Sequence, residues 1–285
     1  MKLLITGAGG QLGSEWIDFC ASNNISFVSY TSSELDICDV TQIKHEVEAQ
    51  KPDVIINCAA YTKVDDAEDY KNLASKINAQ AVKEIAGICA ENKIKLIHYS
   101  TDYVFSGTKD DQQKYPEGYS EEIEADPINS YGLSKWKGEQ EIIKSECDYL
   151  LIRVSWLCGK HGHNFVKTML RLGNEKTELS VVNDQLGSPT FTDQVVEQTF
   201  KLIQKKKSGI FHLSSDGITS WYDFAREIFK QTKITMELKP VTTNEYPTKA
   251  KRPSFSKLST QKISNVDGIH ILHWKDGLKR LLKQL

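Results

Sequence analysis

The chain has 285 residues, with 36 lysines and arginines against 38 aspartates and glutamates. The resulting formal net charge of −2 provides no basic footprint for a nucleic acid, and no apolar stretch reaches the roughly 20 residues that cross a membrane. Six cysteines without a Cys-x-x-Cys pair are expected as small buried side chains, so a reducing compartment, the cytoplasm, is the predicted location.

The first predicted element is a short apolar strand over residues 2–6, followed by Gly7, Gly10 and Gly13. Glycines let the backbone turn sharply and approach a pyrophosphate closely, and a helix over residues 11–23 would direct its unpaired N–H groups to the same place. With Gln11 and Leu12, these glycines predict the pyrophosphate site of a dinucleotide. Taken alone, such a turn is as often structural as functional.

Short β-branched or apolar runs then alternate with longer helical patterns. Strands are predicted at residues 26–30, 54–59, 95–101 and 149–156, and helices at 41–50, 66–92 and 128–146. This alternation predicts an α/β fold, a doubly wound parallel sheet (Rossmann) with right-handed crossovers. Ligands of such sheets gather at the carboxyl ends of the strands.

The alternation weakens after about residue 157, where a smaller C-terminal substrate-binding lobe is predicted to begin. Residues 1–157 are expected to form mainly the NAD(P)-binding domain and residues 158–285 mainly the lobe, with a segment at about 191–215 returning to the main sheet. Helices are predicted at 164–172 and 195–204, and a strand at 209–213. The polar stretch 106–129 is too long for an ordinary connection and is expected to be a lid or a disordered tip.

Tyr131 and Lys135 are four residues apart in the helix predicted over residues 128–146, and therefore lie on one face of it. A free phenol titrates near about 10, and a neighbouring ammonium favours the phenolate. The pair predicts an acid–base site beside a nicotinamide. A half-buried tyrosine near a solvated lysine is the alternative.

Four further segments accompany these motifs, at residues 57–68, 99–107, 153–159 with 164–166, and 181–190. In this combination and order, the chain resembles the dTDP-4-dehydrorhamnose reductases of the extended short-chain dehydrogenase/reductase superfamily, nearly end to end. The resemblance implies that the C4 ketone of a dTDP sugar is reduced, with Tyr131 as the proton donor. Lys135 would hold the nicotinamide ribose, and Thr101 would bond the same carbonyl oxygen.

The cofactor contacts expected at the strand ends include Ala59, Ala60 and Tyr61, where small residues permit close approach. The resemblance adds Asp36 and Ile37 as adenine candidates, with an exposed loop aspartate as the alternative. Residues 29–33 offer neutral hydroxyl groups and no arginine before Glu34. Neutral hydroxyl groups tolerate a 2′-phosphate, so NADPH is the predicted cofactor and NADH is also allowed.

The resemblance also implies a nucleotide-sugar pocket. Its residues would be Thr62, Val64, Thr101, Asp102, Tyr103 and Trp156, with Asn164, Gln185 and Arg252 near the phosphates or the base. A guanidinium suits a diphosphate. The alternatives are a core tryptophan for Trp156 and a strand-edge threonine with a satisfied hydroxyl for Thr101.

No catalytic metal is predicted, since His161 and His163 lack partners at ligand spacing and are expected in a solvated loop. In some relatives, the resemblance implies a magnesium ion held between subunits by the glutamate that matches Glu15. The other ligands of such an ion are not identifiable here. A homodimer is allowed for this chain, and its oligomeric state stays open.

Two rival functions remain open. One is another nucleotide-sugar 4-ketoreductase or epimerase with the same three catalytic residues, because pocket shape alone separates these enzymes. The other is a non-catalytic NADP-binding regulatory subunit, since the family is similar to the beta subunit of methionine adenosyltransferase.

Overall fold

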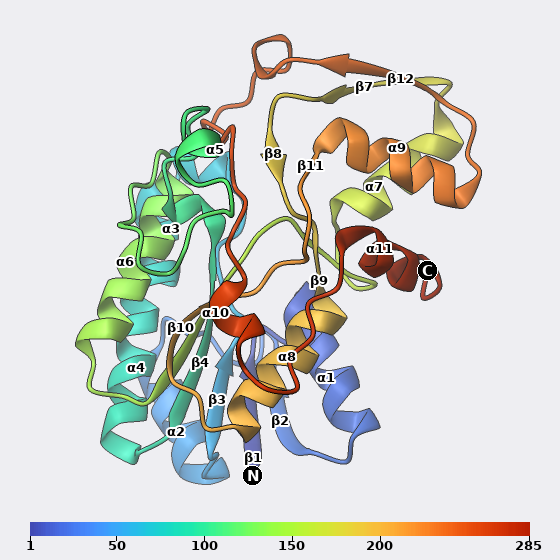
Figure 1. Ribbon diagram of the computed structural model, residues 1–285. Coiled ribbons are helices and arrows are strands. Elements are labelled where there is room, and N and C mark those ends of the chain that lie inside the picture. Colours follow the sequence, from blue (N-terminus) through green and yellow to red (C-terminus); the bar gives the residue numbers. More distant parts are fainter.

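Six short apolar strands form one parallel sheet in the computed structural model, which describes residues 1–285 (Figure 1). The spatial order is β10-β5-β4-β3-β1-β2, and each neighbouring pair is parallel. The strands are β1 (Lys2–Thr6), β2 (Ser26–Tyr30), β3 (Val54–Asn57), β4 (Lys95–Thr101), β5 (Tyr149–Val154) and β10 (Gly209–His212). The predicted doubly wound α/β fold is confirmed.

Helices cover both faces of this sheet. Successive side chains of an apolar strand point to opposite faces, so each face must be buried. Leu3 and Ile5 face the layer formed by α1 (Gln11–Ser22) and α8 (Thr192–Gln204). Leu4 faces the opposite layer, which comprises α2 (Val40–Gln50), α4 (Ala81–Asn92) and α6 (Ser130–Lys144). Burial of both faces explains why the central strands are continuously apolar.

The prediction of a single helix over residues 66–92 is wrong at the N-terminal end. Residues Asp66–Glu68 form only a 3₁₀ turn (η1), and the helix begins with α3 (Lys71–Ser75). It continues through a π-helical turn, η2 (Lys76–Gln80), into α4. Such turns are frequent at functional sites, and this one turns Asn78 toward the segment that follows β3.

Most of the remaining elements lie beyond the carboxyl ends of the sheet strands, in the upper part of Figure 1, whereas α10 (Gln261–Ser264) packs beside β10. Their apolar core contains Phe224, Trp274 and Leu278. The elements are β6 (Leu157–Cys158), α7 (Phe165–Glu175), β7 (Glu178–Val182), β8 (Leu186–Gly187), β9 (Thr190–Phe191), β11 (Thr219–Ser220), α9 (Trp221–Thr232), β12 (Glu237–Val241), η4 (Thr243–Glu245), α10 (Gln261–Ser264) and α11 (Trp274–Leu282).

Residues 106–129 do not form the expected lid or disordered tip. They contain a short helix, α5 (Asp111–Lys114), and Tyr119 is buried with its ring stacked on Phe105 at 4.3 Å. The Asp111 carboxylate accepts hydrogen bonds from Ser106, Thr108 and Tyr119. Buried aromatic rings within a charged stretch therefore make this connection a packed part of the fold.

None of the helices combines the length and the apolar character needed to cross a membrane. All six cysteines are free thiols.

Candidate active site

The β1–α1 turn is shaped by two glycines that no other residue could replace without movement. Gly7 has φ +68°, and an added Cβ would lie 2.6 Å from the amide nitrogen of Ala59. A Cβ on Gly13 would lie 2.2 Å from the carbonyl oxygen of Gly7. Gly10 is the N-cap of α1 without a side-chain cap, so N–H groups at this helix start are free to bind phosphates. The turn therefore fits a dinucleotide pyrophosphate.

The predicted contacts after β2 and β3 surround this turn. Asn57 Oδ1 accepts from the Ala59 amide at 3.2 Å, and Asn78 accepts from the Tyr61 amide at 2.8 Å and donates to its carbonyl at 3.0 Å. The backbone of residues 59–61 is thereby held at the strand ends. Asp36 is exposed, whereas Ile37 is buried within the core beneath α2.

Tyr131 enters the crevice from the first turn of α6. Asn129 caps this helix by accepting from the Gly132 amide at 2.8 Å, and a Cβ on Gly132 would lie 2.1 Å from the Tyr103 carbonyl oxygen. The rings of Tyr131 and Tyr103 meet edge to face at 5.6 Å. This close packing of α6 on the segment after β4 brings Thr101, Asp102 and Tyr131 together.

The pKa of the Tyr131 phenol is raised by burial, with the Thr101 hydroxyl acting in the opposite direction. The expectation that Lys135 lowers this pKa is wrong for the cofactor-free protein. Lys135 Nζ instead donates to the Tyr99 carbonyl oxygen at 2.6 Å and lies 3.2 Å from His98 Nε2. The buried phenol is neutral, which is the form required of a proton donor.

Sequence reasoning missed His98, Asn57 and Asn78. Each could have been noticed in the sequence. His98 is a lone imidazole in an apolar strand, Asn57 ends a buried strand, and Asn78 lies on a buried face of a helix. Buried polar side chains require partners, so each pointed to a contact that sequence alone could not identify.

Asp102 is a buried carboxyl group beside Tyr131. Thr101 Oγ1 donates to Asp102 Oδ1 at 3.0 Å, while Oδ2 has no hydrogen-bond partner. Burial raises the pKa of Asp102 to about 7. Its unpaired oxygen leaves capacity for a polar ligand.

A cavity of about 410 Å³ opens next to this group and is mostly apolar. Arg252 lies at its edge, where Nη1 donates to the Tyr103 hydroxyl at 3.3 Å and Nη2 pairs with Asp65. The lining residues are Tyr103, Phe165, Thr168, Met169, Leu172, Leu179, Ser180, Val181, Val182, Gln185, Trp221, Tyr246, Thr248 and Arg252. An apolar cavity with a few polar groups has the character of a small-molecule site.

Trp156 lies beyond the end of β5, which stops at residue 154 instead of the predicted 156. Its backbone has φ +45°, and its indole stacks on Trp221 with ring centroids 3.5 Å apart. Trp156 Nε1 donates to Ser256 Oγ at 3.0 Å. A Cβ on Gly187 would lie 2.6 Å from this indole, so Gly187 makes room for it.

The remaining predicted substrate residues divide into two groups. Gln185 lines the cavity, and Val64 packs with Tyr61, Tyr103 and Tyr131. Thr62 is exposed, and Asn164 does not line the cavity. Asn164 instead caps α7 and donates to Gln11 Oε1 at 3.1 Å, beside the pyrophosphate turn.

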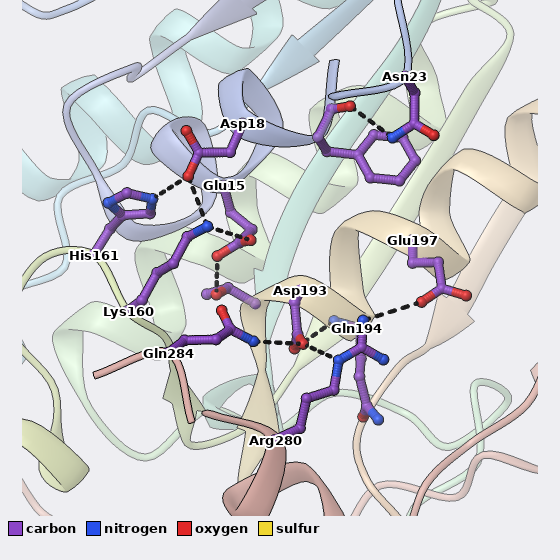
Figure 2. Close-up of polar contacts among 12 residues, drawn as sticks. Glu15, Asp18, Asn23, Lys160, His161, Asp193, Gln194, Glu197, Arg280 and Gln284 are labelled. Atoms are coloured by element: carbon purple, nitrogen blue, oxygen red, sulfur yellow. Dashed lines mark hydrogen bonds and ion pairs between the residues drawn. The ribbon is translucent and has the colours of Figure 1, made fainter. Parts of the chain in front are cut away.

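Glu15 lies in a separate polar groove of about 610 Å³ between α1, α8 and α11 (Figure 2). Lys160 Nζ lies 3.7 Å from Glu15 and 2.8 Å from Asp18, and Thr192 donates to Glu15 at 2.8 Å. His161 also pairs with Asp18 at 2.8 Å, and it lies with exposed His163 in the loop that was expected.

On the opposite side of this groove, Arg280 Nε lies 2.7 Å from Asp193. No group of three or more His, Cys, Asp or Glu side chains has the arrangement of a metal site. The residues present therefore do not fit the magnesium ion of some relatives, because lysine and arginine of this chain already neutralise the carboxylates.

The family model described as the RmlD substrate binding domain matches residues 1–285. A dTDP-4-dehydrorhamnose reductase of Aggregatibacter actinomycetemcomitans is 37% identical over 293 residues, covering 98% of this chain and 98% of that protein. A dTDP-4-keto-6-deoxy-D-glucose reductase of Streptomyces niveus is 34% identical over 279 residues, covering 97% of this chain and 95% of that protein.

A solved structure of dTDP-4-dehydrorhamnose reductase from Bacillus anthracis str. Ames, in complex with NADP, superposes with a TM-score of 0.95. It is 38% identical and covers 100% of this chain and 99% of that chain. On these matches, which extend from one end of the sequence to the other, the chain belongs to the RmlD substrate binding domain family.

Proposed function

We propose that this chain is a dTDP-4-dehydrorhamnose reductase, which reduces the C4 ketone of dTDP-4-dehydro-L-rhamnose to dTDP-L-rhamnose with NADPH, and with NADH as a second donor. The observation that carries this proposal is the packing of buried Tyr131: its ring meets Tyr103, which lines the apolar cavity, and it shares a cluster with Tyr61, two residues after the Ala59 backbone that lies beside Gly7. Full-length similarity to proteins of that name, one of them bound to NADP, supports it.

Tyr131 gives its proton to the oxygen that was the C4 carbonyl, and Thr101 holds this oxygen by a hydrogen bond. When NADPH is bound, its chemistry is the supply of a hydride to the carbonyl carbon. Burial of Tyr131 keeps the phenol protonated until charge develops on the alkoxide. Lys135 holds the nicotinamide ribose.

The cofactor contacts that we propose follow the strand ends. Gly7, Gly10, Gln11, Leu12 and Gly13 surround the pyrophosphate, and residues 59–61 border the nicotinamide half. Asp36 and Ile37 remain the adenine candidates. The buried side chain of Ile37 limits its contribution to backbone contact.

For the sugar nucleotide, we propose that Asp102, Tyr103 and Trp156 border the deoxysugar, with Thr62 and Val64 beside them. Arg252 and Gln185 lie in the cavity, where they can bind the diphosphate and the base. We assign Asn164 to the cofactor side, because it donates to Gln11.

We further infer the division into a cofactor-binding part, mainly residues 1–157, and a substrate lobe, mainly residues 158–285. The pairing of β10 with β5 supports a return of the chain to the main sheet. A cytoplasmic location and a homodimer are also proposed. Sedimentation of the purified chain tests the latter.

The first experiment is NADPH oxidation by the purified chain with dTDP-4-dehydro-L-rhamnose, with the product identified by NMR. Turnover to dTDP-L-rhamnose is the expected result. A parallel reaction with dTDP-4-keto-6-deoxy-D-glucose tests the second candidate, which the Streptomyces niveus relative favours. Cofactor binding without turnover on either sugar would contradict the proposal and favour a regulatory subunit.

A further inference from the structure

A line of buried polar side chains runs from the carboxyl ends of β1 and β3 through the middle of β4 and ends at Lys135. Thr6 Oγ1 donates to Asn57 Oδ1 at 2.7 Å, Asn57 Nδ2 lies 3.1 Å from His98 Nδ1, and His98 Nε2 lies 3.2 Å from Lys135 Nζ. No member is more than 2% exposed. Each polar atom must therefore find its partner within the line.

The orientation of the Asn57 amide determines which nitrogen of His98 carries a proton. The Ala59 backbone amide donates to Asn57 Oδ1 at 3.2 Å, and a backbone N–H can only donate. The other amide atom is therefore the NH₂ group, which donates to His98 Nδ1. Since the ring is neutral, with its pKa held well below the ordinary range by burial, its one proton lies on Nε2.

The Nε2–H of His98 therefore points at Lys135 Nζ. An ammonium group has no lone pair to accept this hydrogen, whereas an uncharged amine has one. Lys135 Nζ at the same time donates to the Tyr99 carbonyl oxygen at 2.6 Å. The whole line is satisfied only when Lys135 is an amine.

Two other ionisable groups lie close enough to Lys135 to act on its pKa. Burial lowers the pKa of Lys135 to about 8, with Glu139 of the same helix and Cys58 after β3 acting in the opposite direction. Glu139 is already engaged by Arg153 at 2.7 Å, and burial keeps the Cys58 thiol protonated.

We propose that His98 is a positioning residue that stabilises the neutral amine form of Lys135 in the cofactor-free protein, so that Lys135 takes up a proton when it turns to the bound nicotinamide ribose. The second clause rests on the proposed function, because it assigns Lys135 to the ribose. The first concerns only the protein itself. Binding of the cofactor would thus create the ammonium beside Tyr131.

His212 provides a matched comparison, because it is also fully buried and neutral, on the edge strand β10 of the same sheet. Its Nδ1 lies 2.9 Å from the Tyr119 carbonyl oxygen, which can only accept, and its Nε2 faces Arg153 Nη1 at 3.2 Å. His212 therefore carries its proton on Nδ1, the opposite tautomer to His98.

The first test is ¹⁵N NMR of the histidine rings in the full cofactor-free chain. The expected result is a neutral Nε2–H ring for His98 and a neutral Nδ1–H ring for His212 at about pH 9, above the lowered pKa of Lys135. An Nδ1–H or a doubly protonated ring at His98 would overturn the proposal. This readout needs neither substrate nor turnover.

The second test is calorimetry of NADP⁺ binding in buffers of different ionisation enthalpy. At about pH 8 the wild-type chain should take up as much as about half a proton on binding, given the lowered pKa of Lys135. His98→Asn keeps an oxygen for Asn57 but removes the N–H that faces Lys135, so the uptake should be smaller than in the wild-type chain. His212→Asn should leave it unchanged.

Equal uptake by the two variants, or no uptake by the wild-type chain, would overturn the proposal. Failure of sugar reduction would contradict the proposed function while leaving the tautomers and the proton uptake as they are. The two failures are therefore distinguishable.

Discussion

Two phenols meet edge to face in the crevice, and their partners differ. The Tyr103 hydroxyl is bonded by Arg252, whereas the Tyr131 phenol lies close to the Thr101 hydroxyl. Tyr131 is buried and Tyr103 is half-buried, so the two phenols differ in burial as well as in partners. One is poised to lose a proton, and the other is part of the cavity wall.

Tyr131→Phe should lower kcat for NADPH oxidation by about 10²–10⁴-fold, because it removes the proposed acid. The cofactor dissociation constant should stay nearly unchanged, since the ring remains. Tyr103→Phe is the matched control, and its lost bond to Arg252 should raise KM while kcat is retained. Steady-state kinetics and fluorescence titration check both, and a Tyr131→Phe variant with wild-type turnover would exclude the assignment.

Asp102 should make folding stability depend on pH. Burial raises its pKa to about 7, so between its ordinary pKa and 7 the folded chain retains a proton that the unfolded chain has lost. The free energy of unfolding should therefore fall as the pH rises through this window, by an amount on the order of a few kcal/mol.

Asp102→Asn should remove this component of the pH dependence, because an amide does not titrate. Urea unfolding at about pH 5 and about pH 8 measures the difference. Asp267→Asn, at a fully exposed side chain, should keep the wild-type slope. A variant of Asp102 that retains this slope would show that another group carries it.

At the scale of elements, the α1 start depends on space that only glycine leaves. Gly13→Ala should lower the free energy of unfolding by about 1–3 kcal/mol and weaken NADPH binding, because the new methyl group meets the Gly7 carbonyl oxygen. Thermal unfolding and NADPH titration measure both effects.

Gly87→Ala in α4 is the control, since an added Cβ there meets no atom within 4 Å. It should raise the free energy of unfolding by about 0.5–1 kcal/mol, because alanine reduces the conformational entropy of the unfolded chain. Equal effects of the two substitutions would show that the close approach at Gly13 determines neither the free energy of unfolding nor NADPH binding.

Periodicity predicted the strands and most helices because burial on two faces leaves a strong pattern. The helix α1, predicted over 11–23, spans Gln11–Ser22, and α6, predicted over 128–146, spans Ser130–Lys144. The π-helical turn at Lys76–Gln80 could not be predicted, because it depends on tertiary contact. A Cβ on Gly138 of α6 would lie 2.0 Å from the Asn78 carbonyl oxygen.

The same reasoning explains the misses around the site. Tyr131 and Lys135 follow from helix geometry, but the direction of Lys135 depends on His98 and the Tyr99 carbonyl, which come from another strand. The position of Asn164 depends on Gln11, which is 153 residues away. Residue type and local spacing carry no information on such distant partners.

At the scale of the whole molecule, the groove between α1, α8 and α11 contains carboxylates that are paired with basic side chains of the same chain (Figure 2). Excess EDTA should therefore leave both the rate of NADPH oxidation and the thermal midpoint unchanged. Lys160→Met, which leaves Glu15 and Asp18 without this partner, should lower the midpoint. Loss of activity with EDTA, restored by Mg²⁺, would contradict this.

The edge position of β10 also bears on how the chain is made. β5 leaves the ribosome as an open strand edge and stays one until residues 209–212 have been synthesised, after α7, β7 and α8. Open edges pair readily with other chains, so the nascent protein is most prone to aggregate, and most in need of chaperones, during this interval. A gene truncated after residue 157 would make that interval permanent.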